Sequence, residues 1–152
     1  MAKVIFSIGA PGSGKSTALK KLATDISATY ICPDEIRKEL FGDEVDHSDD
    51  KKVWQIARDR VAESVKNKHA VVFDSTHTRL ERRKAFIEEV RAMGATSIEG
   101  IFFNLPVEEI LKRNAARDKK VDEDYIRLSV DRLKENPPIE AEGFDALTVI
   151  SE

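Results

Sequence analysis

The stretch GAPGSGKST at residues 9–17 constrains this chain more than any other. It follows the apolar run VIFSI at residues 4–8 and precedes ALKKLA, which has the composition of a helix. A glycine, four residues and then Gly-Lys-Ser, set between a strand and a helix, form the phosphate-binding loop pattern. Glycines let the backbone N–H groups approach an anion, and the start of the helix adds partial positive charge. The pattern therefore predicts an α/β fold with a nucleotide site after its first strand.

The cation and the hydroxyl of this loop indicate what it binds. Lys15 is expected to reach the β- and γ-phosphates of a bound nucleotide, and the Ser16 hydroxyl is expected to ligate Mg²⁺. An ordinary turn before a helix needs one or two glycines and no Lys-Ser after them. The loop residues that we expect to bind the nucleotide are Gly9, Pro11, Gly12, Ser13, Gly14, Lys15, Ser16 and Thr17.

Length and composition favour a single domain, residues 1–152, with a proper hydrophobic core. Of the 152 residues, 41% are hydrophobic, and no apolar run is long enough to span a membrane. Cys32 is the only cysteine, which excludes an intrachain disulfide and a thiolate metal cluster. We therefore expect a cytoplasmic protein that binds no membrane. The net charge of −3 argues against broad non-specific binding of nucleic acids but is compatible with a local basic groove.

Five apolar segments alternate with segments of helical periodicity along the chain. This alternation predicts a three-layer α/β fold with a mostly parallel five-stranded sheet flanked by helices. We expect strands at 4–8, 29–31, 70–73, 97–105 and 146–150, and helices at about 15–27, 33–41, 50–67, 79–93, 107–118 and 123–136. The phosphate-binding loop, Asp34, Asp74 and Pro106 all follow strands, and ligands of such sheets bind beyond the carboxyl ends of the strands. These residues should therefore gather at one edge of the sheet.

Two of the predicted helices have a polar face. In the helix at 33–41, Ile36 and Leu40 share the face expected to pack on the core, while Asp34 and Arg37 lie one turn apart on the other face. In the helix at 79–93, the polar face consists of Arg79, Arg82, Arg83 and Lys84. We expect these four side chains to be solvated, with a contact to nucleic acid as the alternative.

The loop by itself indicates a nucleotide and not a reaction, because GTPases, motor ATPases and small kinases share it. The chain lacks the Asn-Lys-x-Asp motif that reads guanine, and it is short for a motor ATPase. Phosphoryl transfer requires cations around the transferring group and a group that takes the proton of the acceptor hydroxyl. The basic segment 113–120 can supply cations on a closing lid, and Asp34 can supply the base. These features favour a kinase.

Four segments together resemble the P-loop 5′-polynucleotide kinases, and the resemblance covers most of the chain. The segments are GAPGSGKST, CPDEIRKEL, VVFDSTHTRLERR and LPVEEILKRNAARDKKVDEDYIRLSVDRL. The resemblance implies a P-loop kinase fold and transfer of phosphate from ATP to the 5′-hydroxyl end of DNA or RNA. It further implies that Asp34 is the general base, that Arg37 binds a phosphate of the acceptor strand, and that Asp74 lies near the metal ion or the acceptor.

The last of these segments implies a lid at about residues 113–121. Within it, Arg117 would contact the ATP phosphates, with Arg113 in support. The segment agrees with the lid of the family in outline and not residue by residue.

Several candidate residues also have plain structural alternatives. Arg37 can pair with acids in its own helix or in the loop at 43–50, and Arg113 can pair with Glu109 four residues earlier. Asp74 can cap the helix that follows it.

Three functions are open on the sequence. The first is the polynucleotide kinase. The second is a P-loop kinase of a small metabolite such as a nucleoside or a sugar, because related small kinases share the pattern x-Pro-Asp-x-x-Arg. The third is a nucleotide-dependent switch or a repair-complex subunit with little turnover. Asp34 and Arg37 together disfavour the third, because a switch needs no acceptor base. The sequence leaves the oligomeric state open.

Overall fold

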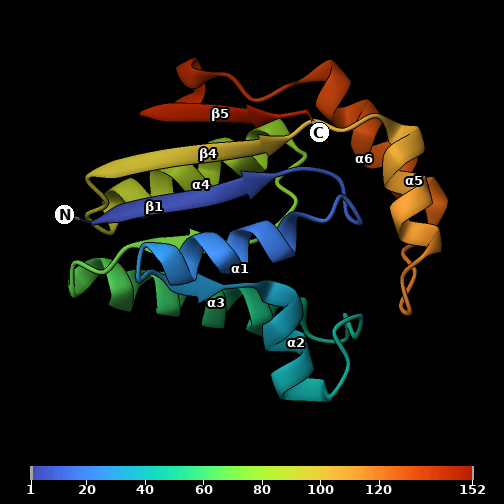
Figure 1. Ribbon diagram of the computed structural model, residues 1–152. Helices are drawn as coiled ribbons and strands as arrows, with labels where there is room; N and C mark the ends of the chain where they lie inside the picture. The colour runs from blue at the N-terminus through green and yellow to red at the C-terminus, as the bar shows by residue number, and fades with distance from the viewer. Residues whose placement is uncertain (1, 152) are drawn as a thin grey trace.

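The computed structural model describes residues 2–151, and its centre is a five-stranded sheet in which all neighbouring strands are parallel (Figure 1). The strands are β1 (Lys3–Ile8), β2 (Thr29–Ile31), β3 (Val71–Phe73), β4 (Ser97–Phe103) and β5 (Ala146–Ile150). Their order in the sheet is β2-β3-β1-β4-β5. Parallel neighbours require crossover connections, which place helices on the faces of the sheet. The predicted α/β fold with a parallel sheet is confirmed.

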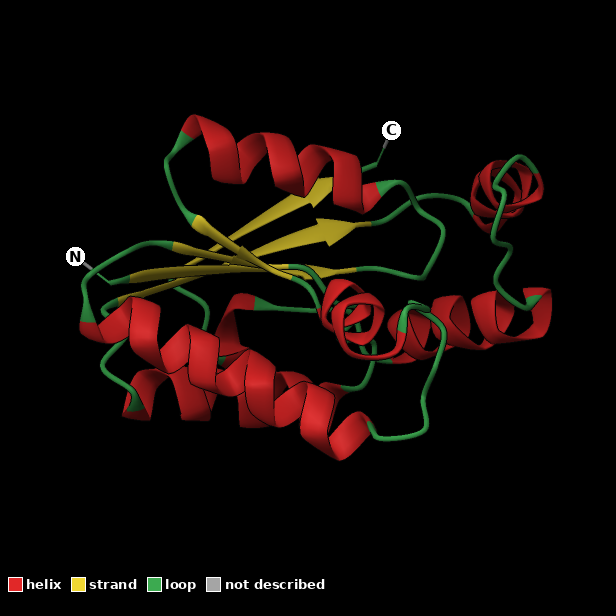
Figure 2. Ribbon diagram, turned by 90° about the horizontal axis from the view of Figure 1, so that it is seen from below, coloured by secondary structure: helices red, strands yellow, loops and turns green. Residues whose placement is uncertain are grey.

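The helices lie on both faces of the sheet and beyond the carboxyl ends of its strands. They are α1 (Lys15–Asp25), α2 (Pro33–Phe41), α3 (Asp50–Lys66), α4 (Leu80–Ala92), α5 (Val107–Ala115) and α6 (Glu123–Glu135), with a short 3₁₀ helix at Glu140–Glu142. α1 covers one face, and α3 and α4 cover the other (Figure 2). α5 and α6 lie beyond the carboxyl ends of the strands (Figure 1). Within residues 2–151, no helix has the length and apolar character needed to cross a membrane.

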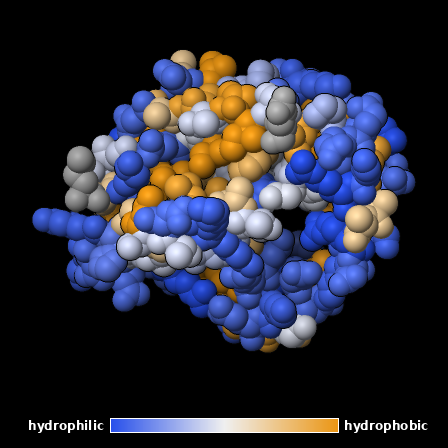
Figure 3. Space-filling model, viewed as in Figure 1, coloured by the Kyte–Doolittle hydropathy of each residue, from blue (hydrophilic) through white to orange (hydrophobic). Residues whose placement is uncertain are grey.

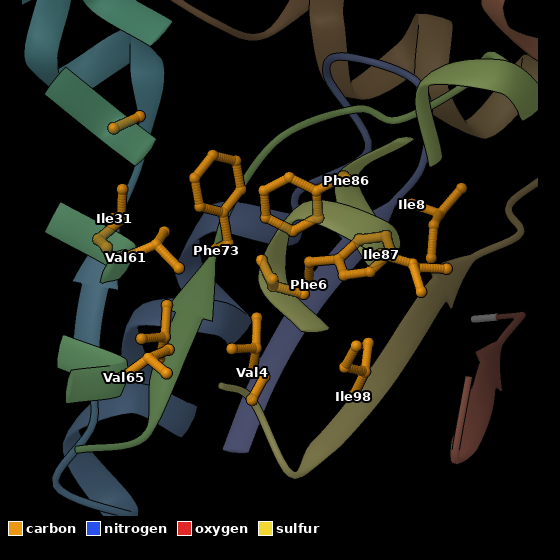
Figure 4. Packing of buried hydrophobic residues seen from close by; sticks show 14 of the residues in the cluster. Val4, Phe6, Ile8, Ile31, Val61, Val65, Phe73, Phe86, Ile87 and Ile98 are labelled. Carbon is orange, nitrogen blue, oxygen red and sulfur yellow. The ribbon is translucent and has the colours of Figure 1, made fainter. Parts of the chain in front are cut away.

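The larger hydrophobic core lies between the sheet and the helices α3 and α4. Alternate residues of β1 point into it, because successive side chains of a strand point to opposite faces. Val4, Phe6 and Ile8 are fully buried there. The ring of Phe86 packs against the rings of Phe6 and Phe73, with centroids 5.1 and 4.8 Å away (Figure 4). Each such side chain stabilises the fold by about 1.5–3 kcal/mol, and this packing fixes the ends of β1 and β3, from which the candidate site extends.

α2 buries a face that differs from the predicted one. Ile36 is buried as expected, but Leu40 is 38% exposed, and Phe41 packs against the core instead. Arg37, predicted to lie on the polar face, is buried. The reason is that α2 packs against α3, whose first residue, Asp50, accepts a hydrogen bond from the Arg37 guanidinium. The predicted core position of Leu40 is therefore wrong.

Arg83 is fully buried, so its predicted place on a solvated face of α4 is also wrong. Its Nε donates a hydrogen bond of 2.8 Å to the buried Glu142 carboxylate. Its other partners are the backbone oxygens of His77, Thr78 and Asn136. These oxygens and the carboxylate replace the water that a buried guanidinium loses. Arg79, Arg82 and Lys84 are exposed, as predicted.

Two boundaries differ from the prediction in a way that concerns the site. The strand predicted at 97–105 ends at Phe103, and the helix predicted at 107–118 ends at Ala115. Arg117 therefore lies in the loop between α5 and α6, and not on a helix.

Candidate active site

The phosphate-binding loop joins β1 to α1, and two of its glycines have left-handed backbone conformations. The φ angle is 84° at Gly12 and 76° at Gly14. Glycine takes such angles without the strain that a Cβ brings. A Cβ on Gly14 would also lie 2.9 Å from Nη1 of Arg113, so a side chain there would displace the Arg113 guanidinium. α1 begins at Lys15, which directs the free N–H groups of its first turn toward the loop.

Two residues of this loop that were predicted to bind the nucleotide, Gly9 and Ser13, pack against the rest of the protein. A Cβ on Gly9 would lie 3.1 Å from the Cβ of Phe103, and the Gly9 N–H donates to the Thr76 carbonyl at 2.9 Å. Ser13 is buried, and its Oγ has no hydrogen-bond partner among residues 2–151. Gly9 and Ser13 therefore shape the loop from beneath.

Lys15 is buried at the base of a cleft that begins at the loop. Burial lowers its pKa, and the nearby carboxylates of Asp74 and Asp34 oppose that decrease. An ammonium group in a cleft beside the start of a helix is suited to hold an anionic group such as phosphate.

Asp74 is the residue directly after β3, and it is 3% exposed. The Tyr30 hydroxyl of β2 donates a hydrogen bond to Asp74 Oδ2. Burial and the Asp74 carboxylate raise the pKa of Tyr30, so this phenol keeps its proton and remains a donor. The alternative role of Asp74 as a helix cap is excluded, because α4 has Arg79 at its N-cap.

Asp34 and Arg37 belong to a chain of charged side chains at the start of α2 and α3. Arg37 Nη1 donates to Asp34 Oδ1 at 2.6 Å, and Arg37 Nε donates to Asp50 Oδ1 at 3.0 Å. Asp50 Oδ2 lies 2.8 Å from Nδ1 of His47. The guanidinium is thus shared by two carboxylates, as the structural alternative for Arg37 anticipates. The Asp34 side chain remains 64% exposed toward the cleft, which leaves its second oxygen accessible.

The segment predicted as a lid lies over the phosphate-binding loop. Arg113 Nη1 donates to the Ser13 carbonyl at 2.8 Å, and Arg113 Nε also pairs with Glu109 at 3.2 Å. A Cβ on Gly12 would lie 3.8 Å from Nη1 of Arg117. Both lid arginines therefore lie beside the two left-handed glycines.

Two further side-chain contacts hold the loop that contains Arg117. The Asn114 side chain accepts from the Val121 N–H at 2.9 Å and donates to the Val121 carbonyl at 2.8 Å, which closes the loop at its base. Farther out, Lys119 Nζ pairs with Asp43 Oδ1 at 2.9 Å, which joins the loop to the segment after α2.

One cleft of about 1370 Å³ connects these groups. Figure 3 shows an opening in this region that is surrounded mainly by hydrophilic residues. Of the residues predicted for the site, the cleft is lined by Pro11, Gly12, Gly14, Lys15, Ser16, Thr17, Asp34, Arg37, Asp74, Arg113 and Arg117. Its volume exceeds the range of about 300–1,000 Å³ that is usual for one small ligand, so a nucleotide and a second substrate can occupy it together.

The cleft offers few side-chain ligands for a metal ion. No group of three or more His, Cys, Asp or Glu side chains in the described part of the chain is placed to hold one. Ser16 and Asp74 line the same cleft, and their side chains carry oxygen atoms of the kind that Mg²⁺ binds. Mg²⁺ usually takes one or two carboxylates together with substrate phosphates and water, so this sparse set fits a magnesium ion that arrives with the nucleotide.

Two residues that were not predicted for the site, Tyr30 and His77, lie in or beside it. Tyr30 contacts Asp74. His77 is buried with a φ of 44°, and its Nδ1 lies 3.2 Å from the Ser7 carbonyl. Burial lowers the pKa of His77 to about 4, so the ring is neutral at pH 7. The partners of Tyr30 and His77 lie on other strands, and no local pattern marks them.

Comparison with known proteins places the chain in a family. A family model described as AAA domain matches residues 4–136. The chain belongs to this AAA domain family. The match includes the phosphate-binding loop at residues 9–17 and the segments around Asp34 and Arg117.

Solved structures share the fold of this AAA domain. A chain in the structure of the Pnkp1/Rnl/Hen1 RNA repair complex is 27% identical, with a TM-score of 0.80 over 95% of this chain and 46% of that chain. This chain thus spans less than half the length of the chain it matches. A gluconokinase from Sinorhizobium meliloti is 16% identical, with a TM-score of 0.65 over 98% of this chain and 82% of that chain.

A shikimate kinase from Bacteroides thetaiotaomicron is 16% identical, with a TM-score of 0.61 over 95% of this chain and 84% of that chain. No curated protein sequence matches this chain. The likeness to the gluconokinase and the shikimate kinase shows that the fold is that of P-loop kinases. Family and fold together support a phosphotransferase, a class of enzyme that uses ATP and typically Mg²⁺.

Proposed function

We propose that this protein is an ATP-dependent kinase that transfers the γ-phosphate to the 5′-hydroxyl end of DNA or RNA. The observation that carries the proposal is that Lys15, the Asp34–Arg37 pair and Arg117 all line one cleft. The 27% identity to a chain of an RNA repair complex favours a polynucleotide as the acceptor over a small metabolite. Residues 1–152 then act as one kinase domain, of which the structure describes residues 2–151.

The nucleotide phosphates lie against the loop N–H groups and the Lys15 ammonium in this proposal. Arg117 adds positive charge to the transferring phosphoryl group, and Arg113 positions the lid through its contact with Ser13. Ser16 and Asp74 would hold Mg²⁺, which neutralises part of the negative charge of the phosphates when bound. Residues at about 113–121 form the lid, which keeps water from the reacting groups when the cleft is occupied.

Asp34 acts on the acceptor. One of its oxygens is held by Arg37, and the other accepts the proton of the 5′-hydroxyl as the hydroxyl oxygen attacks the γ-phosphorus. The bond from the γ-phosphorus to the β–γ bridging oxygen breaks, and ADP leaves with that oxygen. Arg37 uses Nη1 and Nε for the two carboxylates, and no described residue accepts a hydrogen bond from its Nη2. This nitrogen is free to bind a phosphate of the acceptor strand.

Phosphate transfer from γ-labelled ATP tests the proposal. The acceptor panel comprises 5′-hydroxyl DNA and RNA oligonucleotides, nucleosides and sugars, with Lys15→Ala as the inactive control. Labelling of oligonucleotides in preference to nucleosides and sugars supports the proposal. Labelling of a nucleoside or a sugar alone establishes a metabolite kinase instead. Absence of transfer to any acceptor, with ATP still bound, favours a nucleotide-dependent switch.

A further inference from the structure

We propose that Arg79, Arg82 and Arg132 bind backbone phosphates of the acceptor strand beyond its 5′-terminal nucleotide. The inference rests on the proposed function and specifies its acceptor as an oligonucleotide rather than a single nucleoside. All three arginines line the cleft that also contains Asp34 and Lys15.

The three arginines come from two helices that flank one part of the cleft. Arg79 is the N-cap of α4, and Arg82 lies in the first turn of that helix. Arg132 lies in the last turn of α6. Trp54 and His77 line the same cleft, as do residues of the phosphate-binding loop and the arginines Arg113 and Arg117. An acceptor whose 5′ end reaches Asp34 can therefore extend past these three arginines.

The charges of these arginines are uncompensated. No carboxylate of residues 2–151 lies within ion-pair distance of Arg79, Arg82 or Arg132. Two other cations on the same lining have such partners: Arg58 pairs with Glu89 at 2.9 Å, and Lys119 pairs with Asp43 at 2.9 Å. The unpaired guanidinium groups thus remain available to an anion, and a guanidinium matches the geometry of a phosphate.

The local charge of the cleft opposes the charge of the whole chain. The lining contains eleven lysines and arginines and six aspartates and glutamates, although the net charge of the protein is −3. Positive charge is therefore concentrated in the cleft, where the acceptor nucleic acid would bind, while the remaining residues carry a net negative charge. Such a distribution favours a bound polyanion in the cleft over non-specific coating of the surface.

Buried Arg83 holds the two helices in the arrangement that the proposal needs. Its Nη2 donates to the Asn136 carbonyl at 2.7 Å, and the Asn136 N–H donates to the Arg132 carbonyl at 3.0 Å. The Arg83 N–H donates to the Arg79 carbonyl at 3.0 Å. The backbone of Arg79 and that of Arg132 are thus joined through one buried side chain. This explains why the adjacent arginines of α4 differ in burial. Arg83 is buried and joins α4 to the end of α6, and Arg82 lines the cleft.

Acceptor length is the variable that tests the inference. We would measure KM and kcat for a 5′-hydroxyl nucleoside 3′-phosphate, a dinucleotide and a hexanucleotide with the Arg79→Ala/Arg82→Ala/Arg132→Ala variant. We expect KM for the hexanucleotide to rise roughly tenfold or more, with kcat nearly unchanged and KM for the nucleoside 3′-phosphate unchanged. Because each phosphate contact with a single strand contributes about 0.7 to the salt slope, the slope should fall by about 2.

Matched controls separate this site from a general effect of charge. Lys84 lies on α4 and Arg127 lies on α6, and both are exposed and outside the cleft lining. Lys84→Ala/Arg127→Ala should leave KM for every acceptor unchanged. Fluorescence anisotropy of a labelled 5′-hydroxyl hexanucleotide, with a non-hydrolysable ATP analogue present, gives the affinity without turnover. Circular dichroism melting verifies that the variants fold.

Failure of this inference differs from failure of the proposed function. If the wild-type protein phosphorylates oligonucleotides but the triple variant retains the wild-type KM for the hexanucleotide, the proposed phosphate-binding role of the three arginines is wrong. The kinase assignment then stands. The same holds if the control variant weakens binding as much as the triple variant does. If the wild-type protein labels no oligonucleotide, both are overturned.

Discussion

Nη1 of Arg113 lies 2.8 Å from the carbonyl oxygen of Ser13, and this hydrogen bond joins α5 to the phosphate-binding loop across 100 residues of sequence. Glu109 holds the same guanidinium from the other side at 3.2 Å. Arg117, four residues farther on, has no carboxylate partner among residues 2–151. The two arginines of the proposed lid therefore have different surroundings: Arg113 is held by Ser13 and Glu109, and the Arg117 guanidinium has no carboxylate partner among residues 2–151.

This difference leads to the first prediction. Arg117→Ala should lower kcat by on the order of 10³, with a much smaller change in KM for ATP, because a lid arginine acts on charge that develops in the transition state. Arg113→Ala should have a smaller effect on kcat. Steady-state kinetics with varied ATP checks this. Lys112→Ala is the control, since Lys112 is exposed on α5 outside the cleft lining. Similar kcat values for the Arg117 and Lys112 variants would contradict the lid assignment.

The second prediction concerns the base. Asp34→Asn retains size and a hydrogen-bond acceptor for Arg37 but cannot take a proton, so kcat should fall by about 10²–10⁴ for every acceptor. ATP affinity, measured by calorimetry, should remain near the wild-type value. Glu35→Gln is the matched control, because Glu35 is adjacent, exposed and paired with Lys20 outside the cleft lining. A fully active Asp34→Asn variant would show that another group, or none, takes the proton.

The parts of the fold that were predictable from the sequence are those with local signals. The apolar run before GAPGSGKST indicated a buried parallel strand, and β1 is buried along most of its length. Cys32-Pro33-Asp34 indicated a helix start, and α2 begins at Pro33. Because the carboxyl ends of parallel strands meet at one edge, the gathering of Lys15, Asp34 and Asp74 around one cleft also followed from topology.

The parts that were not predictable depend on partners that lie far away in sequence. Arg83 has the pattern of an exposed residue on a basic helix face, and only Glu142, 59 residues later, allows it to be buried. Tyr30 bonds with Asp74, 44 residues away. Leu40 has the right spacing for the core, but the packing of α2 on α3 decides otherwise. Helical periodicity gives the faces of a helix and does not give the neighbour that each face meets.

The third prediction uses the contact of Tyr30 with Asp74. Tyr30→Phe removes one hydroxyl and keeps the ring, so the buried Asp74 carboxylate loses a donor that fixes its orientation. The free energy of unfolding should fall by about 1 kcal/mol. The Mg²⁺ concentration for half-maximal activity should rise severalfold, and calorimetry should show weaker binding of ATP with Mg²⁺ but not of ATP alone. An unchanged magnesium requirement would argue that Tyr30 has only a packing role.

The fourth prediction concerns the buried ion pair. Arg83→Met leaves the Glu142 carboxylate buried without its partner, so the free energy of unfolding should fall by about 3–5 kcal/mol. Urea unfolding measures this. Adding Glu142→Gln removes the unpaired charge and should recover part of the loss. Arg82→Met, one residue earlier and exposed, should change stability by less than about 0.5 kcal/mol. A loss in Arg82→Met equal to that in Arg83→Met would refute the role of the buried pair.

The fifth prediction is a dependence of stability on pH that arises from His77. Its pKa is lowered from 6.5 to about 4, mainly by burial and to a smaller degree by the nearby charges of Arg83 and Lys15, while the Ser7 carbonyl opposes the decrease. The unfolded chain therefore binds a proton near pH 6.5 that the folded protein takes up only near pH 4. Because the unfolded state binds more protons in this window, stability falls as the pH is lowered from about 6.5 to 4, by up to about 3 kcal/mol from this residue.

His77→Asn isolates that contribution. Asparagine tolerates the left-handed φ of 44° at this position and does not titrate. Urea unfolding at pH 7, 6, 5 and 4.5 should give a shallower decrease for the variant than for the wild-type protein, with the two curves converging toward acid pH. His69→Asn is the control, because His69 is exposed. Parallel curves for wild type and His77→Asn would mean that carboxylates, and not this buried ring, determine the acid sensitivity of the fold.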